Sequence, residues 1–283
     1  MNNLLKRTLS GILYVGTVIA CLLYSKTAFC IVFAIVTGWA IDEYNRMLEE
    51  RGLAQPNRMM TMLAGVYLFL VLFLITTNGY SPILFLLFIP YGLTLLFLIA
   101  SELFAGKPQP LANWAYSLAG QVYIALPFAL LNILTYGMKE VQLSWPLSLY
   151  LFIFLWLNDS GAYVFGSLLH NKIPYRLSPH ISPKKTWIGS LGGAATVLAA
   201  SAVAHLCTGQ MGIGFWLGMA CTVIVFGTLG DLVESQMKRQ VGIKDSGSFL
   251  PGHGGVLDRF DSVIFSIPAV IIYVCCYSYL FHH

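Results

Sequence analysis

Residues 59–77 read MMTMLAGVYLFLVLFLITT and contain no charged side chain. About 20 consecutive apolar residues are enough for a helix to cross the hydrocarbon core of a membrane. Eight further apolar stretches, bounded by polar or turn residues, cover 9–25, 27–45, 81–101, 112–134, 146–169, 187–207, 214–237 and 260–280. The sequence therefore predicts an all-α polytopic membrane protein with about nine transmembrane helices. The stretch 27–45 is the weakest, because Gly38, Asp42 and Glu43 interrupt it, and eight helices are the alternative.

The composition excludes an ordinary cytosolic domain. Of the 283 residues, 57% are hydrophobic and 10% are charged, and the mean hydropathy is +0.74. Soluble domains contain roughly 45–50% apolar and about 25% charged residues. The 16 Lys and Arg and 12 Asp and Glu residues are too few to cover a soluble core of this length. Nine spans of about 20 residues leave roughly 100 positions for loops and ends, so no sizeable extramembrane domain is expected.

The basic residues predict the orientation, because Lys and Arg prefer short cytoplasmic loops. If the N-terminus is cytoplasmic and nine helices follow, 14 of the 16 Lys and Arg residues lie inside and only Lys26 and Lys139 lie outside. The N-terminus is therefore expected in the cytoplasm and the C-terminus on the outer side. A cleaved signal is the alternative at the N-terminus, since residues 18–21, VIAC, resemble a lipoprotein cleavage box.

The two halves of the chain differ in their loops. Residues 1–145 are expected to form N-terminal transmembrane helices joined by short, chemically plain loops. Between residues 146 and 283, polar residues crowd two cytoplasmic loops and the helices beside them. This C-terminal transmembrane region is therefore expected to be the catalytic one.

The first polar segment, WLNDSGAY at residues 156–163, places Asp159 inside an otherwise apolar helix. A carboxylate in a membrane helix costs roughly 2.5–3.5 kcal/mol, so it should face a partner or a wet cavity. The alternative is a helix-packing cluster, in which the small residues Ser160, Gly161 and Ala162 provide the contact.

The second polar segment, SPKKTW at residues 182–187, opens the next apolar stretch. Ser182 suits the helix cap and Pro183 the first helical position. A helix N-terminus with Lys184 and Lys185 would be an anion site. The alternative is an ordinary cap whose lysines face anionic lipid headgroups.

The third polar segment, GDLVESQMKR at residues 230–239, ends an apolar run. At helical spacing its polar side chains share one face, namely those of Asp231, Glu234, Ser235 and Lys238. The acids either belong to a site or form a self-satisfied salt-bridge patch with the bases that follow.

The fourth polar segment, KDSGSFLPGHGGVLDRFD at residues 244–261, is the densest. Its glycines permit unusual backbone conformations and close approach to a ligand. Asp258 and Asp261 stand three residues apart at the start of the last helix, so both carboxylates point the same way. Acids in a first turn often only complement the helix dipole, but this pair lies beside Arg259 and a loop that holds His253.

Carboxylates and several Lys and Arg residues at a membrane surface indicate phosphate chemistry. A nucleoside triphosphate and a phospholipid are both anionic, and metal ions and cations neutralise the charge that develops at phosphorus. The six cysteines lie in or beside apolar runs without the spacing of a metal site, so we expect neither disulfides nor zinc. Oxygen ligands favour Mg²⁺.

The four segments, in this order, resemble those of CDP-diacylglycerol synthases (phosphatidate cytidylyltransferases). The resemblance is strong over about residues 150–265 and one of hydropathy and length alone over the N-terminal half. It is carried by DSGAY at 159–163, SPKKTW at 182–187, GDLVES at 230–235 and the run from Ser235 to Asp261.

The resemblance implies transfer of a cytidylyl group from CTP to phosphatidate with Mg²⁺, giving CDP-diacylglycerol and pyrophosphate in phospholipid biosynthesis. It also implies an integral protein of the bacterial plasma membrane, in contact with membrane lipids, with its active site facing the cytoplasm. A homodimer and a second cation such as K⁺ are further expectations. No nucleic-acid partner is expected.

The resemblance also implies residue roles. The metal ligands would be Asp231, Asp258 and Asp261. Further catalytic residues, with the bases clamping phosphates, would be Lys238, Arg239, Lys244, Asp245, His253 and Arg259. Substrate-binding residues would be Asp159, Ser182, Lys184, Lys185, Thr186, Glu234, Gly254 and Gly255. Lys185 matches the lysine of the family's SPxKT pattern, and Lys184, at a position that varies, ranks below it.

Three other functions fit parts of the pattern. A transporter or channel would use intramembrane Asp159, but it would need polar groups at both membrane faces, and the outer loops are nearly chargeless. A CDP-alcohol phosphotransferase would need an Asp-Gly-x-x-Ala-Arg motif, which the sequence lacks. A lipid kinase that uses CTP would employ the same metals and cations for attack at the γ-phosphorus.

Overall fold

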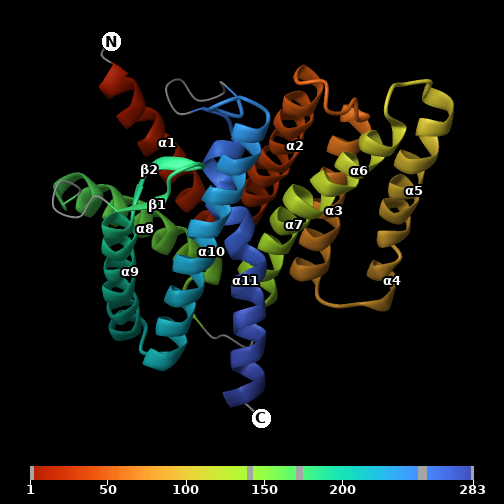
Figure 1. The fold of residues 1–283 in the computed structure, drawn as a ribbon. Helices are drawn as coiled ribbons and strands as arrows, with labels where there is room; N and C mark the ends of the chain where they lie inside the picture. Colours follow the sequence, from red (N-terminus) through yellow and green to blue (C-terminus); the bar gives the residue numbers. More distant parts are fainter. Residues whose placement is uncertain (1–2, 139–142, 170–174, 248–253, 282–283) are drawn as a thin grey trace. The chain divides into compact units, whose positions relative to one another are not determined.

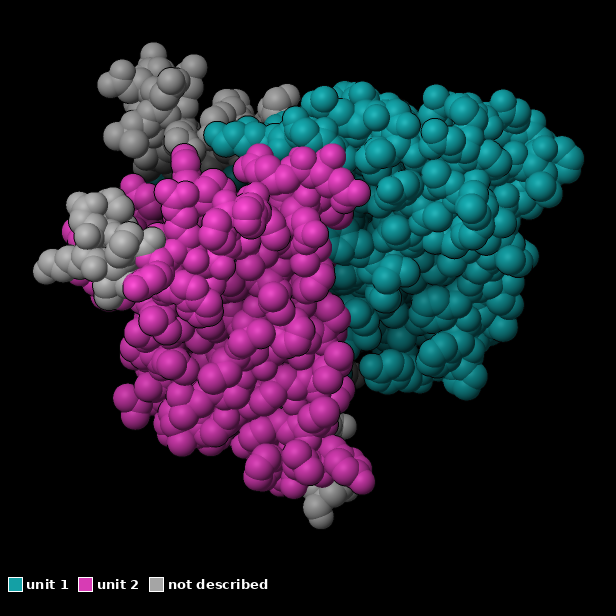
Figure 2. Space-filling model, viewed as in Figure 1, with its two compact units in different colours: residues 1–137, 241–260 teal, residues 138–240, 261–283 magenta. Residues whose placement is uncertain are grey.

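The computed structural model describes residues 3–138, 143–169, 175–247 and 254–281 (Figure 1). The chain forms two compact units, which Figure 2 colours separately. Unit 1 comprises Met1–Gly137 and Val241–Phe260, and unit 2 comprises Met138–Gln240 and Asp261–His283. The polar segment 244–260 thus belongs to the same unit as the N-terminal helices.

Unit 1 is built from helices, whose order in the chain is α1 (Asn3–Tyr24), α2 (Lys26–Glu50), α3 (Arg58–Asn78), α4 (Pro82–Phe85), α5 (Phe88–Ala105), α6 (Pro110–Gly120), the π-helix η1 (Gln121–Ala125), α7 (Leu126–Asn132) and the π-helix η2 (Ile133–Gly137). Unit 2 contains α8 (Leu147–Leu169), strands β1 (Arg176–Ser178) and β2 (Ser182–Thr186), α9 (Trp187–Thr208) and α10 (Ile213–Gln240). The last helix, α11 (Leu257–Phe281), begins in unit 1 and continues in unit 2.

The all-α membrane architecture is confirmed. In the described part of the chain, eight helices are long and apolar enough to cross a membrane, and Ser10–Tyr24 is a shorter apolar helix. The segment 27–45, expected to be the weakest span, lies in one of the eight, the continuous helix α2. The alternative, in which residues 27–45 do not form a transmembrane helix, is therefore not supported. The described residues also include two short strands, β1 and β2, which form a small antiparallel hairpin.

Helix α2 tolerates its polar residues because other side chains satisfy them. Ser25 caps the helix and accepts a hydrogen bond from the Ala28 amide at 3.1 Å. Asp42 accepts from Arg46 at 2.7 Å and from Arg58 of α3 at 2.5 Å. Since a carboxylate in an apolar helix needs a partner, these ion pairs explain why Asp42 does not end the helix.

Aromatic packing forms the core of unit 1. Phe29, Phe33, Phe69 and Phe128 are each fully buried. The Phe29 ring packs on Phe33 and Phe69, with centroids 4.8 and 6.1 Å apart. Phe260, at the start of α11, packs edge-on against Phe128 at 5.3 Å. Burial of such rings contributes roughly 1.5–3 kcal/mol per side chain and fixes the first turn of α11.

In unit 2, glycines allow α8 and α9 to approach closely. A Cβ atom at Gly193 would lie 2.5 Å from the backbone carbonyl oxygen of Asn158 and 3.3 Å from the Ala162 methyl group. A Cβ atom at Gly161 would lie 3.0 Å from the Gly193 Cα. The small residues beside Asp159 therefore do form a helix contact, as the helix-packing interpretation of this segment expects.

We predict that Gly193→Ala destabilises the protein by about 1–3 kcal/mol, because the added methyl group overlaps backbone that cannot move aside. Thermal unfolding in detergent measures the effect. Gly214→Ala in α10 is the matched control, since a Cβ atom there meets nothing within 4 Å. This control should be neutral or slightly stabilising, because alanine favours helix. Equal midpoints for wild type and Gly193→Ala would contradict the packing.

Candidate functional site

The β1–β2 hairpin positions the SPKKT segment. Arg176 pairs with Thr186 and Ser178 with Ser182 in antiparallel register. The Trp187 amide also donates to the Tyr175 carbonyl oxygen at 3.0 Å. The segment is therefore extended up to Thr186, and α9 begins only at Trp187.

The expected helix cap at Ser182 is wrong, and so is the first helical position for Pro183. The cap of α9 is Thr186, whose side-chain oxygen accepts from the Gly189 amide at 3.2 Å. Ser182 lies in β2 because pairing with β1 competes successfully with helix formation. The residues Lys184 and Lys185 consequently lie on a strand that leads to the helix N-terminus, and not in its first turn.

Lys185 and Asp231 form the central charged contact in unit 2. The Lys185 ammonium makes an ion pair with Asp231 Oδ2, and each side chain keeps a little over a quarter of its surface exposed, 27% and 29%. The Ser235 hydroxyl donates to Asp231 Oδ1 at 3.2 Å. Asp231 thus has an opposite charge at one oxygen and a hydrogen-bond donor at the other.

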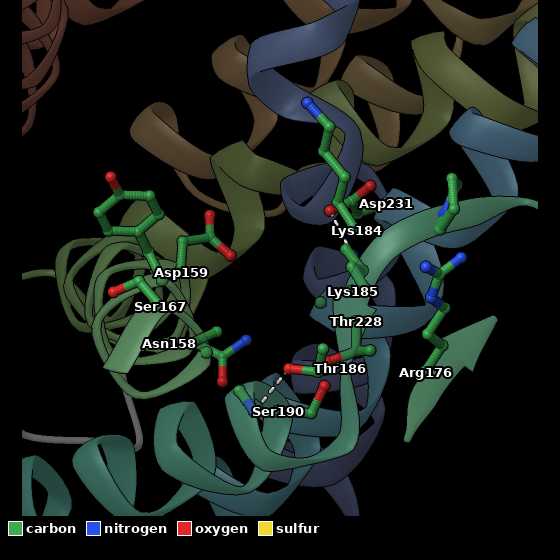
Figure 3. Close-up of a pocket in the computed structure, with 16 residues that line it drawn as sticks. Asn158, Asp159, Ser167, Arg176, Lys184, Lys185, Thr186, Ser190, Thr228 and Asp231 are labelled. Atoms are coloured by element: carbon green, nitrogen blue, oxygen red, sulfur yellow. Dashed lines mark hydrogen bonds and ion pairs between the residues drawn. The ribbon is translucent and has the colours of Figure 1, made fainter. Parts of the chain in front are cut away.

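Lys185 and Asp231 lie on the wall of a cavity of about 660 Å³ within unit 2. Figure 3 shows Asp159 of α8 on one side of this cavity and Lys185, Thr186 and Asp231 on the opposite side. A volume of several hundred Å³ is typical of small-molecule sites. Of the residues expected from the sequence, the cavity therefore brings together Asp159, Lys184, Lys185, Thr186 and Asp231.

Some cavity residues were missed by the sequence reasoning. They are Asn158, Ser167, Arg176, Ser190 and Thr228, together with small or apolar neighbours. Arg176 had a usable signal, because it is one of the basic residues expected in the same loop as Lys184 and Lys185. Thr228 had none, since a threonine in an apolar run reads as an ordinary helix residue.

Asp261 lies close to this region in unit 2. A Cβ atom at Gly230 would meet the Asp261 carbonyl oxygen at 2.6 Å, so α10 and α11 touch at this point. Asp261 Oδ1 accepts from the Ser262 amide at 2.5 Å. The charges of Asp231, Asp159 and Lys238 all act electrostatically on the Asp261 carboxylate. Asp231 and Asp261, two acids from neighbouring helices, are thus close enough for their charges to interact.

Glu234 and Lys238, which the sequence places on the same face of α10 as Asp231, pair with each other. Lys238 forms an ion pair with Glu234 one turn earlier, and both residues are buried. This pair agrees with the salt-bridge interpretation of the segment. Arg239 follows and is exposed.

Unit 1 contains the remaining expected residues that the structure describes. Lys244 and Asp245 are exposed, and Arg259 is partly buried on the first turn of α11. Asp258 Oδ2 accepts from the Ser246 amide at 2.9 Å and from the Gly255 amide at 2.8 Å. His253 lies outside the described residues.

The glycines of the fourth segment approach carboxylates of the chain itself. Gly254 has φ of +82°, and a Cβ atom there would collide with Asp258 Oδ2. A Cβ atom at Gly255 would collide with Glu43 Oε2. Only glycine fits both positions, because the left-handed backbone at Gly254 and the close carboxylates exclude a side chain. Glu43 was noticed in the sequence only as an interruption of an apolar stretch.

Two of the acids, Asp231 and Asp261, would suit a magnesium ion that is held partly by substrate phosphates. Among the residues that the structure describes, no three His, Cys, Asp or Glu side chains form a ready-made metal cluster. Mg²⁺ is usually bound by one or two carboxylates together with phosphate oxygens and waters, and not by an all-protein cage. Asp231 and Asp261 provide such a pair of carboxylates.

The fold and these residues define an integral membrane protein with a charged, small-molecule-sized cavity. Residues 5–277 match the model of the cytidylyltransferase family, so the chain belongs to this family. The resemblance to CDP-diacylglycerol synthases is thereby confirmed at the level of the family.

Curated relatives carry a more specific name. A phosphatidate cytidylyltransferase of Staphylococcus aureus (strain COL) is 45% identical over 125 residues. Those of Staphylococcus haemolyticus and Staphylococcus saprophyticus are 48% and 47% identical over 126 residues. Each match covers 44% of this chain and 47% of the relative, so the chain spans about half the length of the curated relatives it matches.

We predict that Thr186→Ala destabilises the protein by about 1 kcal/mol, because it removes the cap of α9. Ser182→Ala should have a smaller effect, and Thr186→Ser should retain the stability of the wild type. Thermal unfolding of the three variants in one detergent measures the differences. A larger loss for Ser182→Ala than for Thr186→Ala would place the cap at Ser182 after all.

Proposed function

We propose that this protein transfers a cytidylyl group from CTP to phosphatidate, giving CDP-diacylglycerol and pyrophosphate in phospholipid biosynthesis. The observation that carries the proposal is the Lys185–Asp231 ion pair on the wall of the cavity. Membership of the cytidylyltransferase family and the names of the relatives support the nucleotide and the lipid. We place the reaction at a bacterial plasma membrane, with the cavity open to the cytoplasm.

The charges of the cavity suit an anionic ligand that arrives with a cation. Lys185 and Asp231 neutralise each other through their ion pair. A triphosphate with Mg²⁺ would offer phosphate oxygens to the Lys185 ammonium and a cation to the Asp231 carboxylate. Each side chain would then replace one partner of opposite charge by another, so neither charge would be left unpaired at the cavity wall. Arg176 and Lys184, on the same cavity wall, add positive charge for the phosphates.

The proposed reaction is an in-line substitution at phosphorus. An oxygen of the phosphatidate phosphate forms a bond to the α-phosphorus of CTP, and the bond from this phosphorus to the oxygen bridging to the β-phosphate breaks. Pyrophosphate leaves with the bonding electrons. The attacking phosphate is already ionised at neutral pH, so the reaction needs no strong general base. The protein mainly positions the two anions and neutralises their charge.

We assign the cation to the aspartates. Asp231 and Asp261 share one electrostatic environment in unit 2, and Asp258 precedes Asp261 by one turn of α11. When bound, Mg²⁺ supplies charge neutralisation at the phosphates during transfer. K⁺ is a candidate for a second cation. Lys238, Arg239, Lys244 and Arg259 remain candidates for phosphate contacts, and a homodimer is the assembly we propose.

The proposal is tested with purified full-length protein in detergent, phosphatidate, Mg²⁺ and CTP labelled at the α-phosphorus. Cytidylyl transfer predicts label in the lipid fraction and an equal amount of pyrophosphate. A CTP-dependent lipid kinase would instead release labelled CDP and leave the lipid unlabelled. Folded protein that labels no lipid with phosphatidate would contradict the proposal.

We predict that Asp261→Asn lowers transfer on the order of 100-fold or more while the protein still folds, because it removes a carboxylate from the cation. The rate is measured across a range of Mg²⁺ concentrations. Glu50→Gln is the control, since it neutralises an exposed carboxylate of α2 outside this cavity. Near-normal turnover of Asp261→Asn at every Mg²⁺ concentration would remove this residue from the metal site.

Lys185→Ala should lower kcat/KM for CTP by about 10–100-fold, the loss expected when one charge-assisted hydrogen bond to a phosphate disappears. Lys184→Ala should have a smaller effect, because the Lys184 side chain is exposed and Lys185 is partly buried against Asp231. Steady-state kinetics of the two variants provide the comparison. Equal losses would mean that the ion pair with Asp231 does not single out Lys185.

A further inference from the structure

Glu43 is a buried carboxylate that the proposed chemistry does not use. It lies on α2 with 3% of its surface exposed. More than 200 positions separate it in sequence from the segment it contacts, which includes Ser246 and Leu257. Burying a carboxylate at such depth is costly unless hydrogen-bond donors surround it.

Both oxygens of Glu43 accept hydrogen bonds from the start of α11 and the loop before it. Oε1 accepts from the Val256 amide at 3.0 Å. Oε2 accepts from the Leu257 amide at 2.9 Å and from the Ser246 hydroxyl at 3.2 Å. The amides at a helix start have no acceptor within the helix, so a carboxylate from another helix serves them here.

The same segment holds Asp258. The Ser246 hydroxyl donates a hydrogen bond to Glu43 at 3.2 Å, and the Ser246 amide donates one to Asp258 at 2.9 Å. The Gly255 amide donates to Asp258 at 2.8 Å, and a Cβ atom added at Gly255 would collide with the Glu43 carboxylate. Glu43 and Asp258 are therefore linked through two shared residues within unit 1.

Close packing around Glu43 shows that this arrangement is specific. A Cβ atom at Gly247 would lie 2.6 Å from Glu43 Oε1, and one at Gly255 would collide with Oε2. Two glycines of the loop thus leave room for this one side chain. A glutamine would provide one acceptor oxygen, but its NH₂ group would face amide donors.

We propose that Glu43 is a positioning residue: it anchors the first turn of α11 and thereby holds the carboxylate of Asp258, one of the proposed cation ligands. The effect on the cation rests on the proposed function, whereas the anchoring of α11 by Glu43 does not. Outer partners of metal ligands commonly matter in this way, and their loss costs about 10–100-fold in metal affinity or activity.

The test compares Glu43→Gln with Glu102→Gln in the full-length protein. Glu102 is a matched control, because it is also buried in unit 1 and accepts a hydrogen bond, from Asn113 at 2.7 Å. Ser246→Ala, which removes one bond to Glu43 and keeps the carboxylate, is a milder variant in case Glu43→Gln does not fold.

The first readout is residue-resolved amide hydrogen exchange without metal or substrate. Exchange at Val256 and Leu257 should accelerate several-fold in Glu43→Gln, less in Ser246→Ala and not in Glu102→Gln. The second readout is the Mg²⁺ concentration for half-maximal transfer, which should rise about 10–100-fold in Glu43→Gln alone. A general loss of stability would affect both glutamate variants and leave the Mg²⁺ dependence unchanged.

A cavity of about 400 Å³ in unit 1, lined by Glu43, Ser246 and Gly247 among others, permits a rescue experiment. Acetate should partly restore the Mg²⁺ dependence of Glu43→Ala, because it can supply the missing carboxylate, whereas acetamide should not.

Wild-type exchange and wild-type Mg²⁺ dependence in folded Glu43→Gln and Ser246→Ala would overturn the inference. If the wild type transfers no cytidylyl group although exchange changes as expected, the proposed function fails and the anchoring stands. If the wild type transfers the cytidylyl group but Glu43→Gln leaves the Mg²⁺ dependence unchanged, the proposed function stands and the positioning role of Glu43 fails.

Discussion

A carboxylate in an apolar helix must find a cation or hydrogen-bond donors, and much of this structure depends on that constraint. Asp42 meets it with two arginines, Glu102 with Asn113, and Glu43 with two amides and a hydroxyl. Asp231 meets it with Lys185, where the pair lies on the wall of a cavity. The same requirement therefore produces structural contacts in some places and a chemically useful one in another.

Glu43 and Asp231 differ in whether their bonding partners can be replaced by a ligand. The partners of Glu43 are two backbone amides and the Ser246 hydroxyl, so this residue holds segments of the chain in place. The partner of Asp231 is a flexible lysine beside open volume, so an incoming anion and cation can replace both halves of the ion pair. Because of this difference, we propose phosphate chemistry for the cavity and not for the buried anchor.

The sequence predicted the membrane helices well because lipid imposes a simple rule of length and apolarity. The segments SPKKT and GDLVES were also found, since charged residues stand out in an apolar chain. The cap of α9 was predicted at Ser182 and lies at Thr186, because the pairing of β1 with β2 is non-local and local cap preferences do not include it. The role of Glu43 was invisible for the same reason: its partners lie far away in sequence, and on its own it reads as a defect in an apolar stretch.

The central proposal is that the aspartates would hold a divalent cation that neutralises the phosphates of the nucleotide. Pulsed electron–nuclear double resonance with Mn²⁺ in place of Mg²⁺ tests it directly, with the full-length protein and a non-hydrolysable CTP analogue. The account predicts Mn²⁺ binding that depends on the nucleotide, a ³¹P coupling from its phosphates, and loss of this signal in Asp261→Asn. Nucleotide binding that is independent of Mn²⁺, or bound Mn²⁺ without ³¹P coupling, would contradict it.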